Sequence, residues 1–262
     1  MCQKLVLRNA LKEDYTGSVE MNPIGFLKSC YPDKFGTPRQ PGLVPSAQAE
    51  LKLRSDLQPE LALQGLEGFS HIWLIFLFHK NQSARYHAKV HPPRLEGEPI
   101  GLFATRTPHR PNPIGLSLVE LVEIRKDTLI LAGIDLIEGT PILDVKPYLP
   151  AVESKPLART GWTSESRVHH RQVEFSPAAL EALNHWQNQV LILDLRTQIE
   201  DLLKLDPRPL VYRGFEGQKS PYRHEHRVRF YDSDIQFEFL SEDHIRVQQI
   251  QWPFEALQGS LK

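Results

Sequence analysis

Prolines are the feature that most limits the architecture of this chain. The sequence has 21 of them among 262 residues, which is about 8% where ~5% is usual. They are spread over the whole chain in short motifs and form no low-complexity tract. Because proline fixes φ and donates no backbone hydrogen bond, it marks the boundaries of helices and strands. The pattern predicts many short strands joined by stiff, shaped loops.

The composition is that of a soluble globular protein. Hydrophobic residues make up 40% of the chain and charged residues 24%, which is enough for a packed core. The longest uninterrupted apolar run, Ile72–Phe78, has seven residues, whereas a membrane span needs ~20. The N-terminus has no apolar signal core, and Cys2 and Cys30 are too few for a disulfide framework or a four-cysteine zinc site. We therefore expect a soluble, cytoplasmic protein.

The first 160 residues are predicted to be mainly β structure. The Ile72–Phe78 run is apolar throughout, as in a strand buried on both faces. No amphipathic helix of convincing length lies among the strand-like segments, which disfavours a doubly wound α/β sheet. The expected strands are Ile24–Leu27, Ile72–Phe78, Gly101–Thr105, Leu116–Arg125 and Thr128–Leu136.

A small α+β domain is predicted after a boundary near Pro150–Trp162, where prolines, small residues and charges mix. Ser176 and Pro177 suit the N-cap and the first position of a helix. A second helix is expected to begin at Asp194 and to stop before Pro207. Three strands should follow, at Glu225–Tyr231, Ile235–Leu240 and His244–Gln251. The domains are accordingly placed at residues 1–160 and 161–262.

The net charge of −1 gives no general sign of nucleic-acid binding, but one segment is basic. From Arg208 to Arg229 the chain has six Lys or Arg residues and two acids. Such a cluster is an electrostatic footprint for a nucleic acid if its members share one face. The alternative is an ordinary solvated strand surface.

A proline-stiffened loop is predicted within Phe103–Ser117, after a strand that ends at Thr105. Proline restricts both its own φ and the residue before it, so this loop would present its polar side chains from a rigid frame. Such a frame suits a binding site, although a proline-shaped turn whose arginines cap carbonyl groups explains the pattern equally well. The displayed side chains are Arg106, His109, Arg110 and Asn112.

The segment Asp135–Tyr148 contains a second set of polar residues. Its turn at residues 138–141 puts Asp135 and Glu138 near a strand end. Asp144, Lys146 and Tyr148 alternate along the sequence, so they share one face if the chain is extended. A carboxylate, an ammonium group and a phenol side by side can hold and deprotonate an amide-like nitrogen. An ordinary strand with a salt bridge is about as consistent with the spacing.

The loop Lys34–Leu43 is a third segment rich in proline and glycine. It displays Arg39 and Gln40 and could hold a small polar ligand. The sequence has no P-loop, no G-x-S-x-G and no G-x-G, so a Rossmann-type site is not supported. Its histidines complete no metal-ligand set, and we expect no metal.

At these segments the chain resembles the tRNA methyltransferase O family, also called the TsaA-like or YaeB-like proteins. The resemblance covers nearly the full chain. Its most specific motifs are Arg110-Pro-Asn-Pro-Ile-Gly115 and Asp144-Val-Lys-Pro-Tyr148. The other matching stretches are Lys34–Val44, Gly68–His79, Phe103–Pro108, Asp135–Pro150 and Asp206–Arg213.

The resemblance implies a β-barrel-like N-terminal domain that binds S-adenosylmethionine without a Rossmann fold, and a homodimer. It also implies methylation of N6 of threonylcarbamoyladenosine at position 37, beside the anticodon, in tRNAs that read ACY codons. Lys80 stands where many relatives have Gln, and Glu138 where many have Asp. By motif matching, the cofactor contacts are Pro38, Arg39, Gln40, His79, Lys80, Arg106, Leu116 (or Leu118), Asp135, Leu136, Ile137 and Glu138.

In the activity that the resemblance implies, Asp144 is expected to accept the proton or to orient the acceptor. Lys146 would stabilise negative charge on the carbamoyl oxygen, and Tyr148 would pack against the base or hydrogen-bond it. Two other functions stay open: a non-catalytic RNA-binding barrel, and a metal-dependent hydrolase that uses the scattered histidines. The expected RNA contacts are Arg110, Arg213, Arg223 and Arg227.

Overall fold

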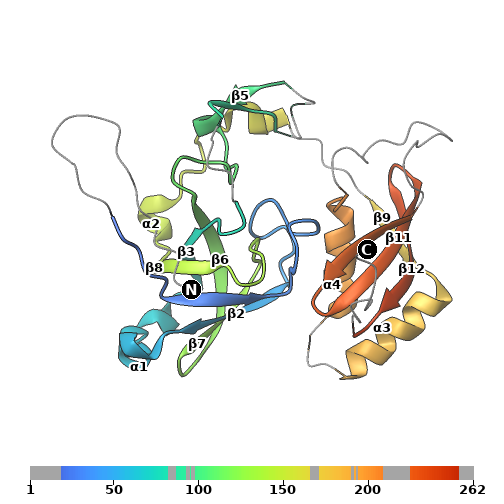
Figure 1. Ribbon diagram of the computed structural model, residues 1–262, viewed down its shortest axis with the longest axis horizontal. Helices are drawn as coiled ribbons and strands as arrows, with labels where there is room; N and C mark the ends of the chain where they lie inside the picture. Colours follow the sequence, from blue (N-terminus) through green and yellow to red (C-terminus); the bar gives the residue numbers. More distant parts are fainter. Residues whose placement is uncertain are drawn as a thin grey trace, which may run out of the picture. The chain divides into compact units, whose positions relative to one another are not determined.

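The structure is a computed structural model of the chain. It describes residues 19–81, 87–92, 95, 98–165, 171–189, 192, 194–208 and 225–253. The chain falls into two compact units (Figure 1): one comprises residues 1–28, 50–131 and 139–154, and the other residues 29–49, 132–138 and 155–262. Residues 29–49, 132–138 and 155–160 thus group with the C-terminal part, and the domain boundary near residue 160 stays a prediction. In the described ranges, every helix is too short or too polar to span a membrane.

Six strands close into a barrel in the order β1-β2-β7-β6-β3-β8. Strand β3 is antiparallel to both of its neighbours, β6 and β8, and β1 is antiparallel to β8. The predicted β-barrel is therefore confirmed. Its strands are β1 (Gly25–Ser29), β2 (Gln48–Leu53), β3 (His71–Leu77), β6 (Ile114–Arg125), β7 (Thr128–Ala132) and β8 (Pro141–Pro147).

Alternate residues along the strands fill the barrel interior. On β2 the buried residues are Ala49, Leu51 and Leu53, and on β6 every second residue from Gly115 to Leu121 is buried. This is the period of a strand with one face inward. The expectation that Ile72–Phe78 is buried on both faces is wrong, because Trp73 and Ile75 are only half-buried. A strand of a closed barrel has only one face toward the interior.

Gly115 is required by the close approach of two strands. It pairs with Phe76 of β3 in the antiparallel register. A Cβ atom at Gly115 would lie 2.2 Å from the Phe76 ring, which no side chain can tolerate without displacing the ring. The glycine that ends the Arg110–Gly115 motif thus makes room for a core aromatic residue.

Two predicted strands are shorter than expected. After β5 (Ile100–Gly101), which pairs with β4 (Lys89–Val90), residues Leu102–Ala104 form a 3-10 helix in place of the strand predicted up to Thr105. The Thr105 hydroxyl and amide both donate to the Leu102 carbonyl oxygen and so close that turn. Strand β7 ends at Ala132 because Gly133 adopts a positive φ of 67°, which extended residues do not have.

The second unit contains a four-stranded sheet in the order β10-β11-β12-β9. The first three strands lie where three strands were predicted; they are antiparallel neighbours, and β9 is parallel to β12. The helices α3 and α4 pack against β9 and β12. These elements are β9 (Gln172–Phe175), α3 (Pro177–Gln189), α4 (Leu195–Lys204), β10 (Glu225–Phe230), β11 (Ser233–Ser241) and β12 (His244–Gln251).

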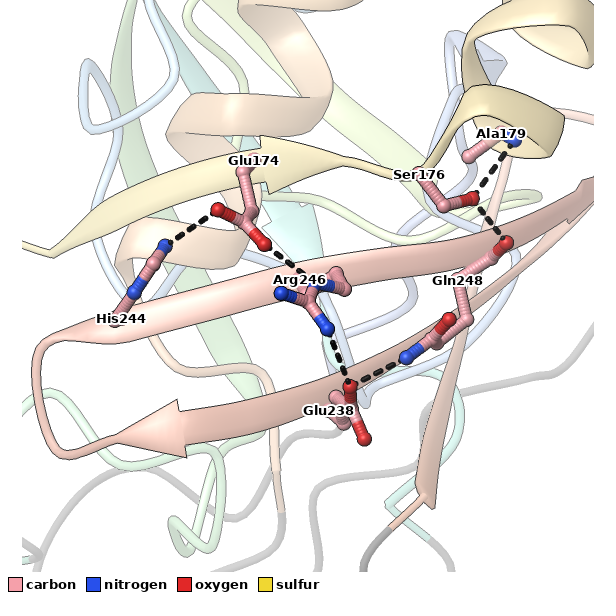
Figure 2. A network of polar contacts seen from close by, with 7 residues as sticks. All are labelled: Glu174, Ser176, Ala179, Glu238, His244, Arg246 and Gln248. Carbon is pink, nitrogen blue, oxygen red and sulfur yellow. Dashed lines mark hydrogen bonds and ion pairs between the residues drawn. The ribbon is translucent and has the colours of Figure 1, made fainter.

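The two predicted helices begin where the sequence placed them. The Ser176 hydroxyl accepts a hydrogen bond from the Ala179 amide at 3.1 Å and donates to the Gln248 carbonyl oxygen at 2.7 Å, so it caps α3 and ties it to β12 (Figure 2). Helix α4 follows Asp194 and buries an apolar face. The remaining short elements are a 3-10 turn at Ser55–Leu57, α1 (Pro59–Ala62), a 3-10 turn at Leu66–Gly68, α2 (Pro150–Glu153) and a 3-10 turn at Gly161–Glu165.

Candidate functional site

The end of β1 holds the predicted Asp135–Glu138 segment in place. The Ser29 hydroxyl donates to the Leu136 carbonyl oxygen at 2.6 Å, and the Ser29 amide donates to the Glu138 carboxylate at 2.5 Å. The Glu138 amide in turn donates to the Tyr31 carbonyl oxygen at 2.8 Å. Glu138 therefore already supports the backbone with its carboxylate, and Leu136 has a buried side chain. Asp135 is the carboxylate of this segment that is half-buried.

The predicted Pro38–Gln40 segment lies in the same unit. Pro38 is buried, Arg39 is exposed, and the Gln40 side chain donates to the Arg39 carbonyl oxygen at 2.5 Å. Two residues further on, the Gly42 amide donates to the Gly133 carbonyl oxygen at 2.8 Å. That bond brings the loop beside the chain that leads into Asp135. The structure thus gathers the predicted residues 38–40 and 135–138 into one region of the second unit.

The turn between β10 and β11 supports this region. The Tyr231 amide donates to the Cys30 carbonyl oxygen at 2.7 Å, and the rings of Tyr31 and Phe230 pack with centroids 5.6 Å apart. Gly36, with φ of 93°, lies so close to Val228 that a Cβ atom there would be 2.4 Å from a Val228 methyl group.

Cys30 lies at the centre of this packing. Its side chain is buried, and burial raises the pKa of its thiol far above the ordinary value. Burial is also the main reason why the pKa of Tyr31 is raised. Both groups stay neutral at physiological pH, so Cys30 is a structural thiol and no nucleophile.

A second set of predicted residues gathers in the first unit, where β3 ends. The Phe78 amide donates to the Pro113 carbonyl oxygen at 2.8 Å, and the Asn81 side chain donates to the Pro108 carbonyl oxygen at 2.9 Å. These two bonds hold the turn with His79 and Lys80 against the proline-rich loop that carries Arg106.

The surroundings of His79 shift its protonation equilibrium. Partial burial, reinforced by the adjacent Lys80 ammonium group, holds the pKa of His79 below its ordinary value of 6.5. The imidazole is therefore neutral at physiological pH. A neutral ring can accept a hydrogen bond or lie near a cation without repulsion.

The proline-rich loop is fixed by its own side chains. The Arg110 guanidinium donates to the Thr105 carbonyl oxygen at 2.9 Å and lies over the ring of Phe103, 5.7 Å from its centroid. Arg106 is exposed on the same loop, and Leu116 is 53% exposed at the start of β6. One of its arginines thus caps a carbonyl group, as the alternative explanation of this segment predicted, and the binding role of the loop stays a prediction.

Asp144 and Lys146 project from the outer face of β8. They pair in register with Ile75 and Trp73 of β3, whose side chains also face away from the interior. The Lys146 ammonium group lies 2.8 Å from the Asp144 carboxylate, and the Val145 amide donates to the same carboxylate at 2.9 Å. The predicted shared face and the predicted salt bridge are thus both present.

Tyr148 follows the last residue of β8 and packs beside that face. Its amide donates to the His71 carbonyl oxygen at 3.0 Å, and its ring meets the Trp73 indole edge-on, with centroids 6.1 Å apart. The Trp73 indole nitrogen donates to the Glu153 carboxylate at 2.9 Å. The edge-on aromatic pair and the carboxylate–ammonium pair thus lie close together on the outside of the barrel.

Arg208, the first member of the predicted basic cluster, is a structural residue. Its guanidinium makes two hydrogen bonds to the Asp206 carboxylate, at 2.8 and 2.9 Å, and lies 3.6 Å from the centroid of the Phe239 ring. The Arg208 side chain is 8% exposed. The Asp206–Pro209 motif therefore encodes a buried ion pair, which is costly to break.

Arg227, predicted to contact RNA, is paired with a carboxylate. Its side chain is 62% exposed, and its guanidinium lies 3.1 Å from Asp234. Arg246, on β12 of the same sheet, bonds to Glu174, which also accepts from His244, and reaches Glu238 at 3.7 Å (Figure 2). Carboxylates thus balance the described arginines on this face of the sheet. Arg213 and Arg223 lie outside the described residues.

Sequence reasoning missed several residues that support these regions. Ser29 and Asn81 each hold one candidate segment through a hydrogen bond, and Tyr231 bonds to Cys30, beside Ser29, from a distant part of the sequence. A serine at the end of a short strand was the only local signal for Ser29. Among the residues that the structure describes, no three His, Cys, Asp or Glu side chains are grouped so as to hold a metal ion.

Comparison with known proteins gives matches over most of the chain. A family model described as the tRNA-methyltransferase O N-terminal domain matches residues 26–154, and one described as the TrmO C-terminal domain matches residues 169–252. An Escherichia coli K12 protein named tRNA (adenine(37)-N6)-methyltransferase is 40% identical over 236 residues, which are 86% of this chain and 97% of that protein.

Two further relatives extend the comparison. A Pyrococcus abyssi protein described as a "probable S-adenosyl-L-methionine-binding protein" is 38% identical over 149 residues, which are 56% of this chain and 77% of that protein. The crystal structure of TrmO from Pseudomonas aeruginosa superimposes with a TM-score of 0.71 at 35% identity and covers 89% of this chain and 98% of that one. Sequence and structure therefore agree on one group of relatives.

Proposed function

Because the chain belongs to the tRNA-methyltransferase O family, we propose that it is an S-adenosylmethionine-dependent enzyme that methylates N6 of adenine 37 in tRNA. The observation that carries this proposal is the match to both family domains, together with an Escherichia coli relative of which 97% is covered and whose name states that activity. The family assignment disfavours the non-catalytic RNA-binding module and the metal-dependent hydrolase.

The substrate within this activity is threonylcarbamoyladenosine at position 37 of tRNAs that read ACY codons. This part of the proposal rests on the same family motifs. The polar and aromatic groups on the outer face of β8 suit such a substrate, because Lys146 and Tyr148 can meet a carbamoyl oxygen and a purine ring.

The residues proposed for the cofactor fit its chemistry. S-adenosylmethionine carries a sulfonium cation, an amino group, a carboxylate and an adenine. Asp135 offers a carboxylate for the amine, and Arg39 and Arg106 are exposed guanidinium groups for the carboxylate tail. Glu138 contributes through the backbone that it orders, because its carboxylate accepts the Ser29 amide. The other proposed cofactor residues are Pro38, Gln40, His79, Lys80, Leu116, Leu136 and Ile137.

When bound, the cofactor supplies an electrophilic methyl group. The target nitrogen bears a carbamoyl group, so its lone pair is delocalised and its proton has to leave as the new bond forms. Asp144 is proposed either to accept that proton or to orient the group that accepts it. Lys146, whose ammonium group lies 2.8 Å from Asp144, is the group proposed to stabilise negative charge on the carbamoyl oxygen. Tyr148 positions the base through ring contact.

The assembly proposed with this function is a cytoplasmic homodimer. Its catalytic domain is residues 1–160 and its smaller C-terminal domain is residues 161–262. Arg110, Arg213, Arg223 and Arg227 are the proposed RNA contacts. Arg227 contributes less than a free guanidinium would, because Asp234 already neutralises it.

Methyl transfer to tRNA tests the proposal directly. Purified full-length protein is incubated with S-adenosylmethionine and tRNA from a strain that lacks the gene, and nucleosides are separated by mass spectrometry. We expect threonylcarbamoyladenosine to gain one methyl group and unmodified adenosine to stay unchanged. A preparation that binds S-adenosylmethionine by calorimetry yet leaves every nucleoside unmethylated would favour the RNA-binding module. Stoichiometric metal without cofactor binding would favour the hydrolase.

A further inference from the structure

Phe103 is an aromatic side chain displayed on the surface of the barrel unit. It lies in the 3-10 helix Leu102–Ala104 and is 79% exposed, whereas its neighbour Leu102 is 2% exposed. A single exposed apolar residue carries no argument, because many protein surfaces have them. The surroundings of Phe103 distinguish it from the other exposed apolar side chains.

The first distinguishing feature is a fixed guanidinium group. Arg110 lies over the Phe103 ring at 5.7 Å and is held there by its hydrogen bond to the Thr105 carbonyl oxygen. Thr105 is itself bonded to Leu102 through its hydroxyl group. The 3-10 turn therefore fixes the backbone on either side of Phe103, so the aromatic and the cationic group are positioned before any ligand arrives.

The second feature is the local charge. The sequence contains no Asp or Glu from Pro99 to Val119, although the chain has 32 of them. The same segment carries Arg106, His109 and Arg110. An aromatic ring in an acid-free, basic segment suits a polyanion with flat aromatic groups better than it suits an apolar protein surface.

We propose that Phe103 is a stacking platform for an unpaired base of the tRNA anticodon loop, with Arg110 holding the ring and meeting the adjacent phosphate. This inference rests on the proposed function for tRNA as the ligand. Proteins that read single-stranded RNA stack its bases on aromatic side chains and on arginine planes. The adenine at position 37 lies in that loop, so a neighbouring base is within the same short stretch of unpaired RNA.

The test compares three substitutions of Phe103 in the full-length protein. Phe103→Ala removes the ring, Phe103→Leu keeps apolar bulk without a π face, and Phe103→Trp keeps a π face. Dissociation constants for an anticodon stem-loop RNA are measured by fluorescence anisotropy without cofactor. We expect Phe103→Ala and Phe103→Leu to weaken RNA binding about 5- to 100-fold, as for the loss of one stacked base. The dissociation constant of Phe103→Trp should stay within about 2-fold of wild type.

Two controls accompany these variants. Leu61 is 61% exposed in the same unit and carries no aromatic ring, so Leu61→Ala should leave the RNA affinity unchanged. The affinity for S-adenosylmethionine and the thermal midpoint should also be unchanged in all Phe103 variants. Removal of an exposed ring costs little buried area.

Each other outcome overturns the platform. If the Phe103→Leu protein binds RNA as tightly as wild type does, the contact is apolar and no base stacks on this side chain. If the Phe103→Ala protein retains full RNA affinity, no base contacts Phe103. A change in the oligomeric state of that variant would then identify this surface as a subunit interface. A wild-type protein that binds no stem-loop RNA overturns the proposed function as well. A wild type that methylates tRNA alongside an equally tight Ala variant overturns the platform alone.

Discussion

The backbone amide of Tyr231 donates a hydrogen bond to the carbonyl oxygen of Cys30, with 2.7 Å between the two atoms. These residues are about 200 positions apart in the sequence, and the bond joins the turn after β10 to the segment that follows β1. Cys30 adjoins Ser29, which holds the Leu136 and Glu138 backbone segment. The C-terminal sheet therefore supports residues that are proposed to bind the cofactor.

Replacement of Gly36 tests this support. Gly36→Ala places a methyl group 2.4 Å from Val228 in a backbone conformation that alanine disfavours, with φ of 93°. Gly42→Ala is the matched control, since its φ is 77° and nothing lies within 4 Å of the added methyl group. We expect Gly42→Ala to lower the free energy of unfolding by about 1–2 kcal/mol and Gly36→Ala by a further 1–3 kcal/mol, roughly.

Urea unfolding curves measure both effects. The additional substitution Val228→Ala removes the side chain that the new methyl group meets, so it should recover part of the loss in Gly36→Ala. Equal losses for the Gly36 and Gly42 variants would show that the loop does not press on β10.

Much of the fold was predictable from local signals. Ser176 and Pro177 marked the start of α3 because a capping hydroxyl and a proline act within a few residues of the helix end. The prediction of a strand at Gly101–Thr105 also relied on local signals, and it was wrong. Its apolar residues suit a strand, but the bonds from Thr105 to Leu102 close a 3-10 turn.

The sequence gives the candidate site only as a list of residues, which stays a prediction, and it does not give the contacts that hold those residues in place. Asp144 and Lys146 share a face because alternation in a strand is a local property. The contact of Gly36 with Val228 and the bond of Cys30 with Tyr231 depend on non-local packing. A single sequence contains no signal for such pairs, and the packing alone determines them.

Loss of the Arg106 side chain should weaken cofactor binding. If its guanidinium makes a charge-assisted hydrogen bond to the cofactor carboxylate, Arg106→Ala should cost about 1.5–3 kcal/mol, or roughly 10- to 150-fold in Kd. Isothermal titration calorimetry with S-adenosylmethionine measures the change. Arg125→Ala is the control, because Arg125 is 60% exposed and pairs with Glu123, two residues away in the sequence. Unchanged affinity in a folded Arg106→Ala protein would remove Arg106 from the site.

The stability of the protein should depend on pH through His79. Its folded-state pKa lies below the ordinary 6.5, because the ring is partly buried and adjoins Lys80. The unfolded state therefore takes up the proton first as the pH falls, and the stability that is present above 6.5 is lost as the pH falls through the lower, folded-state pKa. Carboxylates with lowered pKa values, such as Glu174, act only below 4.5.

Urea midpoints between about pH 7.5 and pH 5 measure this effect. We expect the wild-type midpoint to fall over this range and the midpoint of His79→Gln to fall less. A pH dependence that is identical in the two proteins would assign the effect to other groups.

Charge reversal at the proposed RNA contacts should weaken tRNA binding without affecting the cofactor. The combined change of Arg213, Arg223 and Arg227 to Glu should raise the KM for tRNA and flatten its dependence on salt, because fewer counterions are released. Arg227→Glu alone should have a smaller effect, since Asp234 lies 3.1 Å from its guanidinium. Initial rates at several salt concentrations measure both. A triple variant with the wild-type salt slope would place the tRNA elsewhere.

The chemical step is tested by Asp144→Asn, which is nearly isosteric. The Asn side-chain oxygen can still accept the hydrogen bond that the Val145 amide donates to the Asp144 carboxylate at 2.9 Å. The substitution removes the negative charge that faces Lys146. A positioned proton acceptor typically contributes ~10²–10⁴-fold, whereas in-line positioning of the reactants is unaffected. We therefore expect the variant to bind cofactor and tRNA with wild-type affinity and to lose most of its single-turnover rate. Glu123→Gln, an exposed carboxylate in the same unit, is the control. A near wild-type rate for Asp144→Asn would make Asp144 a structural residue of β8 and leave the proton acceptor to be sought among other groups.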